Sequence, residues 1–216
     1  MRINGAIFDM DGTLTDSMQV WKTVGSEFLK GCGFVPKDDV DRKFCSMSVF
    51  EAVKFLKRDY DLPGDEKEII EAIDRSVERR YLKEVPLKPG VLEFLEFLSE
   101  KNVAMSVATA TDKYMADAAL SRLGIRHYFK DILTSQIVGK GKSEPDIYLR
   151  SAELLGTKAE ETAVFEDSVV AVNTAKRAGF FVAGLYDDSF SYAWDEVQRV
   201  ADISAENILD LKKYFE

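Results

Sequence analysis

The most informative segment for the fold is Ile3-Asn4-Gly5-Ala6-Ile7-Phe8-Asp9-Met10-Asp11-Gly12. Its short apolar run predicts a buried strand over residues 3–9. Two aspartates, two positions apart, follow at the end of that strand, and Gly12 allows the chain to turn sharply away from them. The stretch therefore predicts the first strand of a buried sheet with acidic side chains at its carboxyl end.

The next segment has only helical periodicity. Apolar side chains recur at helical spacing in three stretches, over residues 17–31, 49–56 and 69–81, and no convincing strand pattern separates them. We therefore expect residues 16–83 to form an all-helical cap domain inserted after the first strand. The core domain would comprise residues 1–15 and 84–216, with hinges near Thr15-Asp16 and Glu84-Val85-Pro86.

Beyond Pro86 the pattern alternates between strands and helices. Strands are expected at 103–109, 132–134, 162–166 and 181–185, separated by helices at 91–98, 113–123, 147–155 and 169–178. Such alternation predicts an α/β fold in which a Rossmann-like parallel sheet is covered on both faces, giving three layers. The tail reads as helical, and Asp187-Asp188-Ser189 as a loop at the sheet edge.

Composition excludes several classes of protein. The chain has 216 residues, a formal charge of −9 and 46% hydrophobic residues, which argues against disorder and against a basic nucleic-acid binder. No apolar run reaches the roughly 18 residues of a membrane span. Cys32 and Cys45 lack metal spacing, and His127 is the only histidine, so a histidine-rich zinc site is excluded. With no signal-peptide pattern at the start, we expect a cytoplasmic protein with no membrane or nucleic-acid partner.

Polar side chains gather where the expected strands end, and ligands of open parallel sheets bind at that edge. The set comprises Asp9, Asp11, Thr109, Glu166, Asp167 and, from a glycine-rich loop, Lys142. Four carboxylates and one ammonium sum to about −3, so they cannot converge without protons or a cation. A hard divalent cation such as Mg²⁺, which prefers oxygen ligands and is often shared with a phosphate, would reduce the sum to about −1.

The paired aspartates suggest phosphoryl chemistry. One carboxylate can attack phosphorus, while a second protonates the leaving oxygen and later deprotonates water. Adjacent strand residues point to opposite faces, so Asp167 is preferred over Glu166 as the third acid facing a metal. Thr109 and Lys142 are the natural partners of a phosphate.

Four motifs in order carry a resemblance to a known superfamily. They are the stretch Phe8-Asp9-Met10-Asp11-Gly12-Thr13-Leu14-Thr15-Asp16-Ser17, Thr109, Lys142 with Pro145-Asp146, and Phe165-Glu166-Asp167-Ser168. They resemble the motifs of haloacid dehalogenase (HAD) superfamily hydrolases, and the helical insert resembles the helical-cap subfamily of β-phosphoglucomutase-like phosphatases. Ser143 departs from the pattern, since proline usually follows the motif's lysine.

The resemblance implies a role for each matched residue. Asp9 would be the nucleophile and Asp11 the general acid/base, while Thr109, Ala110 and Lys142 would bind the phosphoryl group. Mg²⁺ would be held by Asp9, the backbone carbonyl of Asp11 and Asp167, with Glu166 either a direct ligand or behind one. In the cap, the residues that could face substrate are Trp21, Arg42, Lys43 and Ser46.

The expected function is a Mg²⁺-dependent phosphatase that hydrolyses a small phosphorylated metabolite through an aspartyl-phosphate, as a monomer or weak homo-oligomer. Asp11 favours phosphoryl transfer over halide displacement, because dehalogenases of the superfamily lack that second aspartate. Two alternatives remain open. One is a sugar-phosphate mutase, which the absence of a cap histidine near Trp21 disfavours; the other is a non-catalytic sensor of phosphorylated metabolites.

Overall fold

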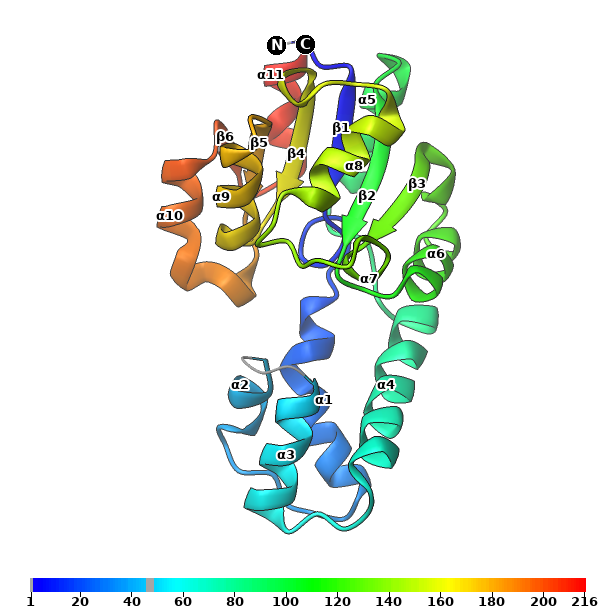
Figure 1. The fold of residues 1–216 in the computed structure, drawn as a ribbon, viewed down its shortest axis with the longest axis vertical. Helices are drawn as coiled ribbons and strands as arrows, with labels where there is room; N and C mark the ends of the chain where they lie inside the picture. Colours follow the sequence, from blue (N-terminus) through cyan, green and yellow to red (C-terminus); the bar gives the residue numbers. More distant parts are fainter. Residues whose placement is uncertain (1, 46–48) are drawn as a thin grey trace. The chain divides into compact units, whose positions relative to one another are not determined.

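A computed structural model describes residues 2–45 and 49–216 of the chain. These residues form two compact units. The core unit contains the chain up to Asp16 together with Pro86–Glu216, and the helical unit contains Ser17–Val85. The α/β core with an all-helical insert is the predicted fold class (Figure 1).

The core unit is built on a parallel sheet of six strands in the order β3-β2-β1-β4-β5-β6. The strands are β1 (Gly5–Phe8), β2 (Ala104–Thr109), β3 (Phe129–Thr134), β4 (Thr162–Glu166), β5 (Phe181–Leu185) and β6 (Ile203–Ala205). Strand β1 is central, with Phe8 paired to Val107 of β2 on one side and to Phe165 of β4 on the other. The strands that end in Asp9, Thr109 and Glu166 are therefore neighbours.

Alternate residues of these strands bury opposite faces of the sheet, as the two-residue strand period requires. On one face, Ile7 and Val164 belong to an aliphatic cluster with side chains from α8 (Asp146–Leu155) and α9 (Val169–Arg177), which lie in front of the sheet in Figure 1. α10 (Trp194–Val200) packs beside α9 and contributes Val197 to the same cluster.

Aromatic side chains fill the other face. The rings of Phe8 and Phe165 stack with centroids 4.4 Å apart, and Phe94 of α5 (Val91–Glu100) meets Phe165 edge-on at 5.4 Å. Phe215 of α11 (Lys212–Phe215) closes this cluster, 5.8 Å from Phe165. Packing thus holds Phe8, which precedes Asp9, and Phe165, which precedes Glu166, and so fixes where β1 and β4 end.

The structure corrects the sequence expectations at several short elements. The tail is not entirely helical, because Ile203–Ala205 pairs with β5 as an edge strand. Strand β3 begins at Phe129, earlier than expected. The short helices α2 (Val40–Cys45) and α7 (Ser135–Val138) were not anticipated. The remaining elements are α6 (Lys113–Arg122) and the 3₁₀ turns η1 (Arg126–Tyr128), η2 (Ala159–Glu161), η3 (Asp188–Ala193) and η4 (Ile208–Leu211).

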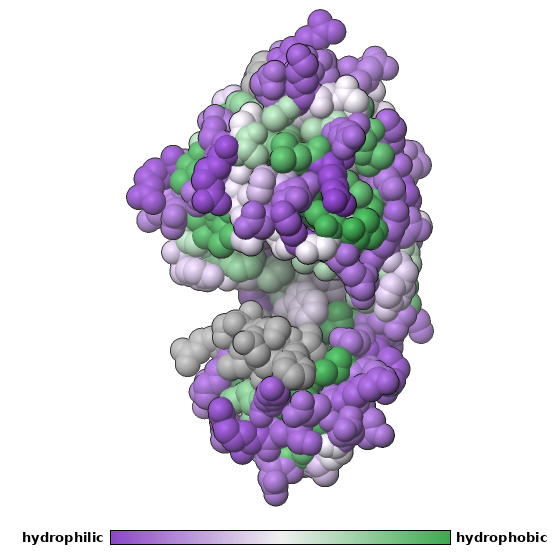
Figure 2. Space-filling view, in the orientation of Figure 1, coloured by the Kyte–Doolittle hydropathy of each residue, from purple (hydrophilic) through white to green (hydrophobic). Residues whose placement is uncertain are grey.

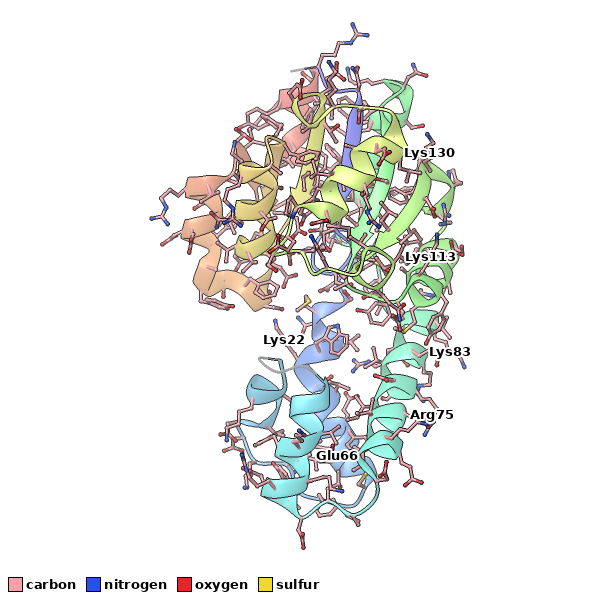
Figure 3. All side chains as sticks on the ribbon, in the orientation of Figure 1. Lys22, Glu66, Arg75, Lys83, Lys113 and Lys130 are labelled. Atoms are coloured by element: carbon pink, nitrogen blue, oxygen red, sulfur yellow. The ribbon has the colours of Figure 1, made fainter. Side chains whose placement is uncertain are left out.

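The helical unit contains α1 (Met18–Gly31), α2, α3 (Val49–Tyr60) and α4 (Glu66–Lys83). Asp65 caps α4 by accepting a hydrogen bond from the backbone N–H of Lys67 at 2.8 Å. α4 is amphipathic: it buries Ile69, Ile73, Val77 and Tyr81. Its opposite side carries charged residues such as Arg75 and Lys83 (Figure 3).

Figure 2 shows that hydrophilic residues dominate the visible surface, with apolar residues interspersed among them on the core unit. Within the described residues, no helix combines the length and the apolar character needed to cross a bilayer.

Candidate active site

The residues singled out in the core unit gather at the carboxyl edge of the sheet. Asp9 follows β1 directly, Thr109 is the last residue of β2, and Glu166 ends β4 with Asp167 after it. Lys142 reaches this edge from the loop between α7 and α8. Because β1 lies between β2 and β4, the site has two parts, which we call the β1–β4 junction and the β1–β2 junction. Asp9 and Asp11, which follow β1, lie between them.

The β1–β4 junction holds a buried cluster of charges. Carboxylate oxygens of Asp9, Glu166 and Asp167 lie within 4.8 Å of one another. Lys142 Nζ contacts Asp9 Oδ1 and donates to Glu166 Oε1 at 2.6 Å. Asp9 and Asp167 are only 6% and 3% exposed, and Glu166 is fully buried. Three acids thus face one lysine in a region that water reaches poorly.

This concentration of charge changes the affinity of the groups for protons. Burial raises the pKa of Asp9, and the charges of Glu166 and Asp11 raise it further, while Lys142 opposes the shift. Burial likewise raises the pKa of Asp167 well above its ordinary value, and the charges of Asp9 and Glu166 add to the rise. Burial alone would lower the pKa of Lys142, but Asp9 and Glu166 hold it well above its usual range. The positive charge of Lys142 is therefore too small to offset the burial and mutual repulsion of the three carboxylates.

The unpartnered oxygens of the cluster fit a hard cation. Asp9 Oδ2 and Asp167 Oδ2 are buried, and no described residue donates a hydrogen bond to either. Buried carboxylate oxygens without donors are costly unless a cation or proton meets them. An all-oxygen donor set is what Mg²⁺ prefers. The residues present therefore fit a divalent metal ion beside Asp9 and Asp167.

Glu166 is placed differently from its two acidic neighbours, because protein donors already occupy both of its oxygens. Oε1 accepts from Lys142 at 2.6 Å and from the Tyr148 hydroxyl at 3.1 Å, and Oε2 accepts from the Ser168 backbone N–H at 3.2 Å. The pKa of Tyr148 is raised well above its usual range, by burial first and then by the charge of Glu166, so the phenol stays a donor. Glu166 thus acts as the anchor of Lys142.

The β1–β2 junction is built from hydroxyl groups. Asp11 Oδ2 accepts a hydrogen bond from Thr111 Oγ1 at 2.6 Å and a longer one from Thr109 Oγ1 at 3.3 Å. Thr109 Oγ1 in turn accepts from the backbone N–H of Thr111 at 3.0 Å, so the residues after β2 turn around it. Asp11 is half-buried, and Ala110 is exposed beside this turn. Asp11 therefore lies closer to solvent than Asp9 does.

The expected cap residues are only partly described. Trp21 of α1 donates its indole N–H to the Tyr81 hydroxyl at 3.2 Å. Lys43 of α2 pairs with Asp39 at 2.7 Å. Ser46 and the side chain of Arg42 lie outside the described residues. The suggested substrate contacts of all four remain predictions.

Sequence reasoning missed Thr111 and Tyr148. Thr111 stands two positions after Thr109, and that spacing was an available signal, because residues just after a strand share its edge. Tyr148 belongs to an apolar helical stripe and carries no local sign of a polar role, so its hydroxyl contact could not be read from sequence.

Comparison with known proteins agrees with this geometry. Residues 3–179 match the family of haloacid dehalogenase-like hydrolases. The chain is 29% identical to a phosphorylated carbohydrates phosphatase of Thermotoga maritima over 216 residues, covering 98% of this chain and 99% of that protein. It is 28% identical to a fructose-1-phosphate phosphatase of Escherichia coli, covering 82% and 94%.

Among solved structures, a β-phosphoglucomutase candidate from Thermotoga maritima superimposes with a TM-score of 0.87 at 27% identity, over 100% of both chains. The family match spans residues 3–179, most of the chain, and the residues gathered at the carboxyl edge lie within that range. The protein therefore belongs to the haloacid dehalogenase-like hydrolases.

Proposed function

We propose that the protein is a phosphatase that hydrolyses a small phosphorylated carbohydrate through an aspartyl-phosphate on Asp9. One observation carries the proposal: Asp9 and Asp167 converge in a buried cluster with Lys142, and each acid keeps one oxygen without a protein donor. Such a cluster suits a cation and an anionic group that share one space.

Asp9 is the proposed nucleophile. An oxygen of its carboxylate forms a bond to phosphorus as the ester P–O bond breaks, and Asp11 gives a proton to the departing oxygen. Water then attacks the phosphorus of the aspartyl-phosphate, Asp11 takes a proton from it, and inorganic phosphate leaves with Asp9 restored. The half-buried position of Asp11 supports this role, because a general acid/base must exchange protons with substrate and water.

The remaining residues of the core site bind and orient. Lys142, anchored by Glu166, supplies positive charge to the phosphoryl group, and Thr109 with Ala110 lines its other side. Asp9, Asp167 and the backbone carbonyl of Asp11 would hold Mg²⁺, which would neutralise charge on the phosphoryl oxygens. Glu166 is proposed not as a metal ligand but as a support for Lys142, since its oxygens already have donors.

The substrate class rests on the relatives. A phosphorylated carbohydrates phosphatase and a fructose-1-phosphate phosphatase resemble this chain over most of its length. The helical segment expected at residues 16–83, most of which forms the helical unit Ser17–Val85, would act as a cap that excludes bulk water during transfer. Trp21, Arg42, Lys43 and Ser46 remain the proposed cap residues for substrate.

A mutase is the second candidate, because the solved structure compared above is a β-phosphoglucomutase candidate. A mutase must return the phosphoryl group to a sugar rather than to water. Trp21 stands where the mutase branch is expected to carry a histidine, and its indole N–H is directed to Tyr81. An indole N–H donates but does not accept a proton, so hydrolysis is favoured.

The test is a screen of phosphorylated sugars, polyols, nucleotides and cofactors with detection of inorganic phosphate, with and without Mg²⁺. We expect phosphate release from sugar or polyol phosphates that EDTA stops and Mg²⁺ restores. Exchange between sugar-phosphate isomers without phosphate release, above all with a bisphosphate activator, would establish the mutase. Full activity in EDTA would contradict the proposed metal site.

A further inference from the structure

Lys88 lies between the loop that carries Asp11 and the end of β5. It belongs to the segment that leads into α5, and its side chain is only 18% exposed. Its ammonium donates to three oxygens: the Gly12 carbonyl at 2.7 Å, the Tyr186 carbonyl at 2.7 Å and Asp187 Oδ2 at 3.0 Å. All three N–H bonds of a lysine are thus used by acceptors that come from two separate loops.

The contact between Lys88 and the Gly12 carbonyl bears on the backbone at Asp11, because Gly12 directly follows Asp11. Gly12 has a φ of +92°, in the region where a backbone without a side chain turns freely. The backbone N–H of Gly12 donates to the Thr15 carbonyl at 2.9 Å, and the backbone carbonyl of Gly12 accepts from the Lys88 ammonium. Both peptide units flanking this pliable residue are therefore held, and the first of them includes the Asp11 carbonyl.

The segment around Lys88 is itself fastened to the same loop. The Lys88 backbone N–H donates to the Leu14 carbonyl at 3.0 Å, and Asp16 N–H donates to the Pro86 carbonyl at 3.0 Å. Lys88 thus contacts the loop after β1 through its backbone as well as its side chain. Its ammonium adds a bond across that loop to the β5 end.

Asp187, which accepts from Lys88 after the end of β5, is itself held in one position. Its side chain is 6% exposed, and its second oxygen accepts from the backbone N–H of Ser189 at 2.8 Å. Burial would raise the pKa of Asp187, but the Ser189 and Lys88 hydrogen bonds lower it below its usual value, so the group is an anion opposite Lys88. A fixed anion beside two carbonyls gives the ammonium one defined position.

We propose that Lys88, held by Asp187, is a positioning residue that fixes the backbone around Asp11 for general acid/base catalysis. The proposal rests on the proposed function, because it assigns Lys88 a part in the step that Asp11 performs. Lys88 touches neither the phosphoryl group nor the nucleophile; it acts through the Gly12 peptide. Its loss should therefore spare the attack by Asp9 and slow the steps in which Asp11 moves a proton.

The experiment uses p-nitrophenyl phosphate, whose p-nitrophenolate departs without being protonated. With saturating Mg²⁺, stopped-flow absorbance separates the first transfer to Asp9, seen as a burst, from the slower hydrolysis of the aspartyl-phosphate. For Lys88→Met we expect a burst close to one equivalent of enzyme at a near-normal rate. Steady-state turnover should fall roughly 10²-fold, as for a misplaced catalytic group.

Lys176→Met is the matched control. Lys176 also pairs with a partly buried aspartate, Asp202 at 2.7 Å, but that aspartate accepts from Val182 near the amino end of β5. The control should turn over like the unaltered protein. Asp187→Asn should lie between the two, because its amide oxygen still accepts from Lys88 while the charge is lost.

Steady-state turnover of Lys88→Met within about threefold of the unaltered protein would overturn the proposal. So would equal losses in burst rate and turnover, which would mark a general structural role. If Lys88→Met folds too poorly to give a burst, the same two criteria are applied to Asp187→Asn. If the unaltered protein hydrolyses no phosphate ester, the proposed function itself fails, and the positioning role with it.

Discussion

The two sides of the site are built on different principles. At the β1–β4 junction, carboxylates are buried against one lysine, and two of their oxygens lack described donors. At the β1–β2 junction, Asp11 receives hydrogen bonds from two threonine hydroxyls and lies closer to solvent. The first side thus carries an excess of negative charge, whereas on the second side neutral hydroxyl groups donate to one carboxylate.

The difference separates two chemical tasks. A buried cluster of carboxylates with too little positive charge around it favours the binding of a cation. A divalent cation, together with Lys142, would supply positive charge when an anionic phosphoryl group binds. A half-buried acid with hydroxyl donors can exchange protons, which an acid locked against a cation cannot. Asp9 belongs to the first side and Asp11 to the second, although only one residue separates them.

Asp9→Asn tests the first side and should have the largest effect. The amide keeps the shape but loses the attacking carboxylate, so turnover should fall by about 10⁴-fold or more in a phosphate-release assay. Asp202→Asn serves as the control and should retain activity, because the Asp202 carboxylate accepts from Val182 near the amino end of β5. Substantial turnover by Asp9→Asn would remove the nucleophile from the account.

Asp11→Asn tests the second side. Loss of the proton donor and acceptor should slow turnover roughly 10²- to 10⁴-fold, the usual range for general acid/base catalysis. Because Asp9 remains, p-nitrophenyl phosphate should still phosphorylate the variant, and acid quenching should trap an aspartyl-phosphate. Near-normal turnover would require another residue as the acid/base.

Thr111→Val also tests the second side and should have a smaller effect. The change removes the 2.6 Å hydrogen bond to Asp11 while nearly preserving volume. One such bond to a charged group corresponds to about tenfold in kcat. Thr111→Ser keeps a hydroxyl and should recover most of that loss. Equal activity of the valine and serine variants would show that the contact does not orient Asp11.

Much of this arrangement was predictable from the sequence because it depends on strand ends. Apolar runs locate β1, β2, β4 and β5, and parallel strands place the polar residues after them at one edge. This logic brings together Asp9, Thr109 and Asp167 without knowledge of any contact. The expected strand at 132–134 was also found, although it begins earlier.

The elements that escaped prediction lack a local signal. Strand β6 has three residues, too few for a period to be recognised, and it exists only because β5 pairs with it. Lys88 and Asp187 are 99 positions apart, and neither stands in a pattern that distinguishes it from an exposed charge. Asp187 was expected in a loop at the sheet edge, yet its side chain is buried. Contacts of this kind arise from the fold as a whole.

Calorimetric titration of the EDTA-treated protein with Mg²⁺, beside Asp167→Asn, shows directly whether the buried acids hold a metal ion. Because burial raises the pKa of Asp9 to about 8, protons compete with the cation at low pH. We predict one site per chain, weaker at about pH 5 than at about pH 8, and lost in Asp167→Asn. Equal Mg²⁺ binding by Asp167→Asn, or none by the unaltered protein, would contradict the account.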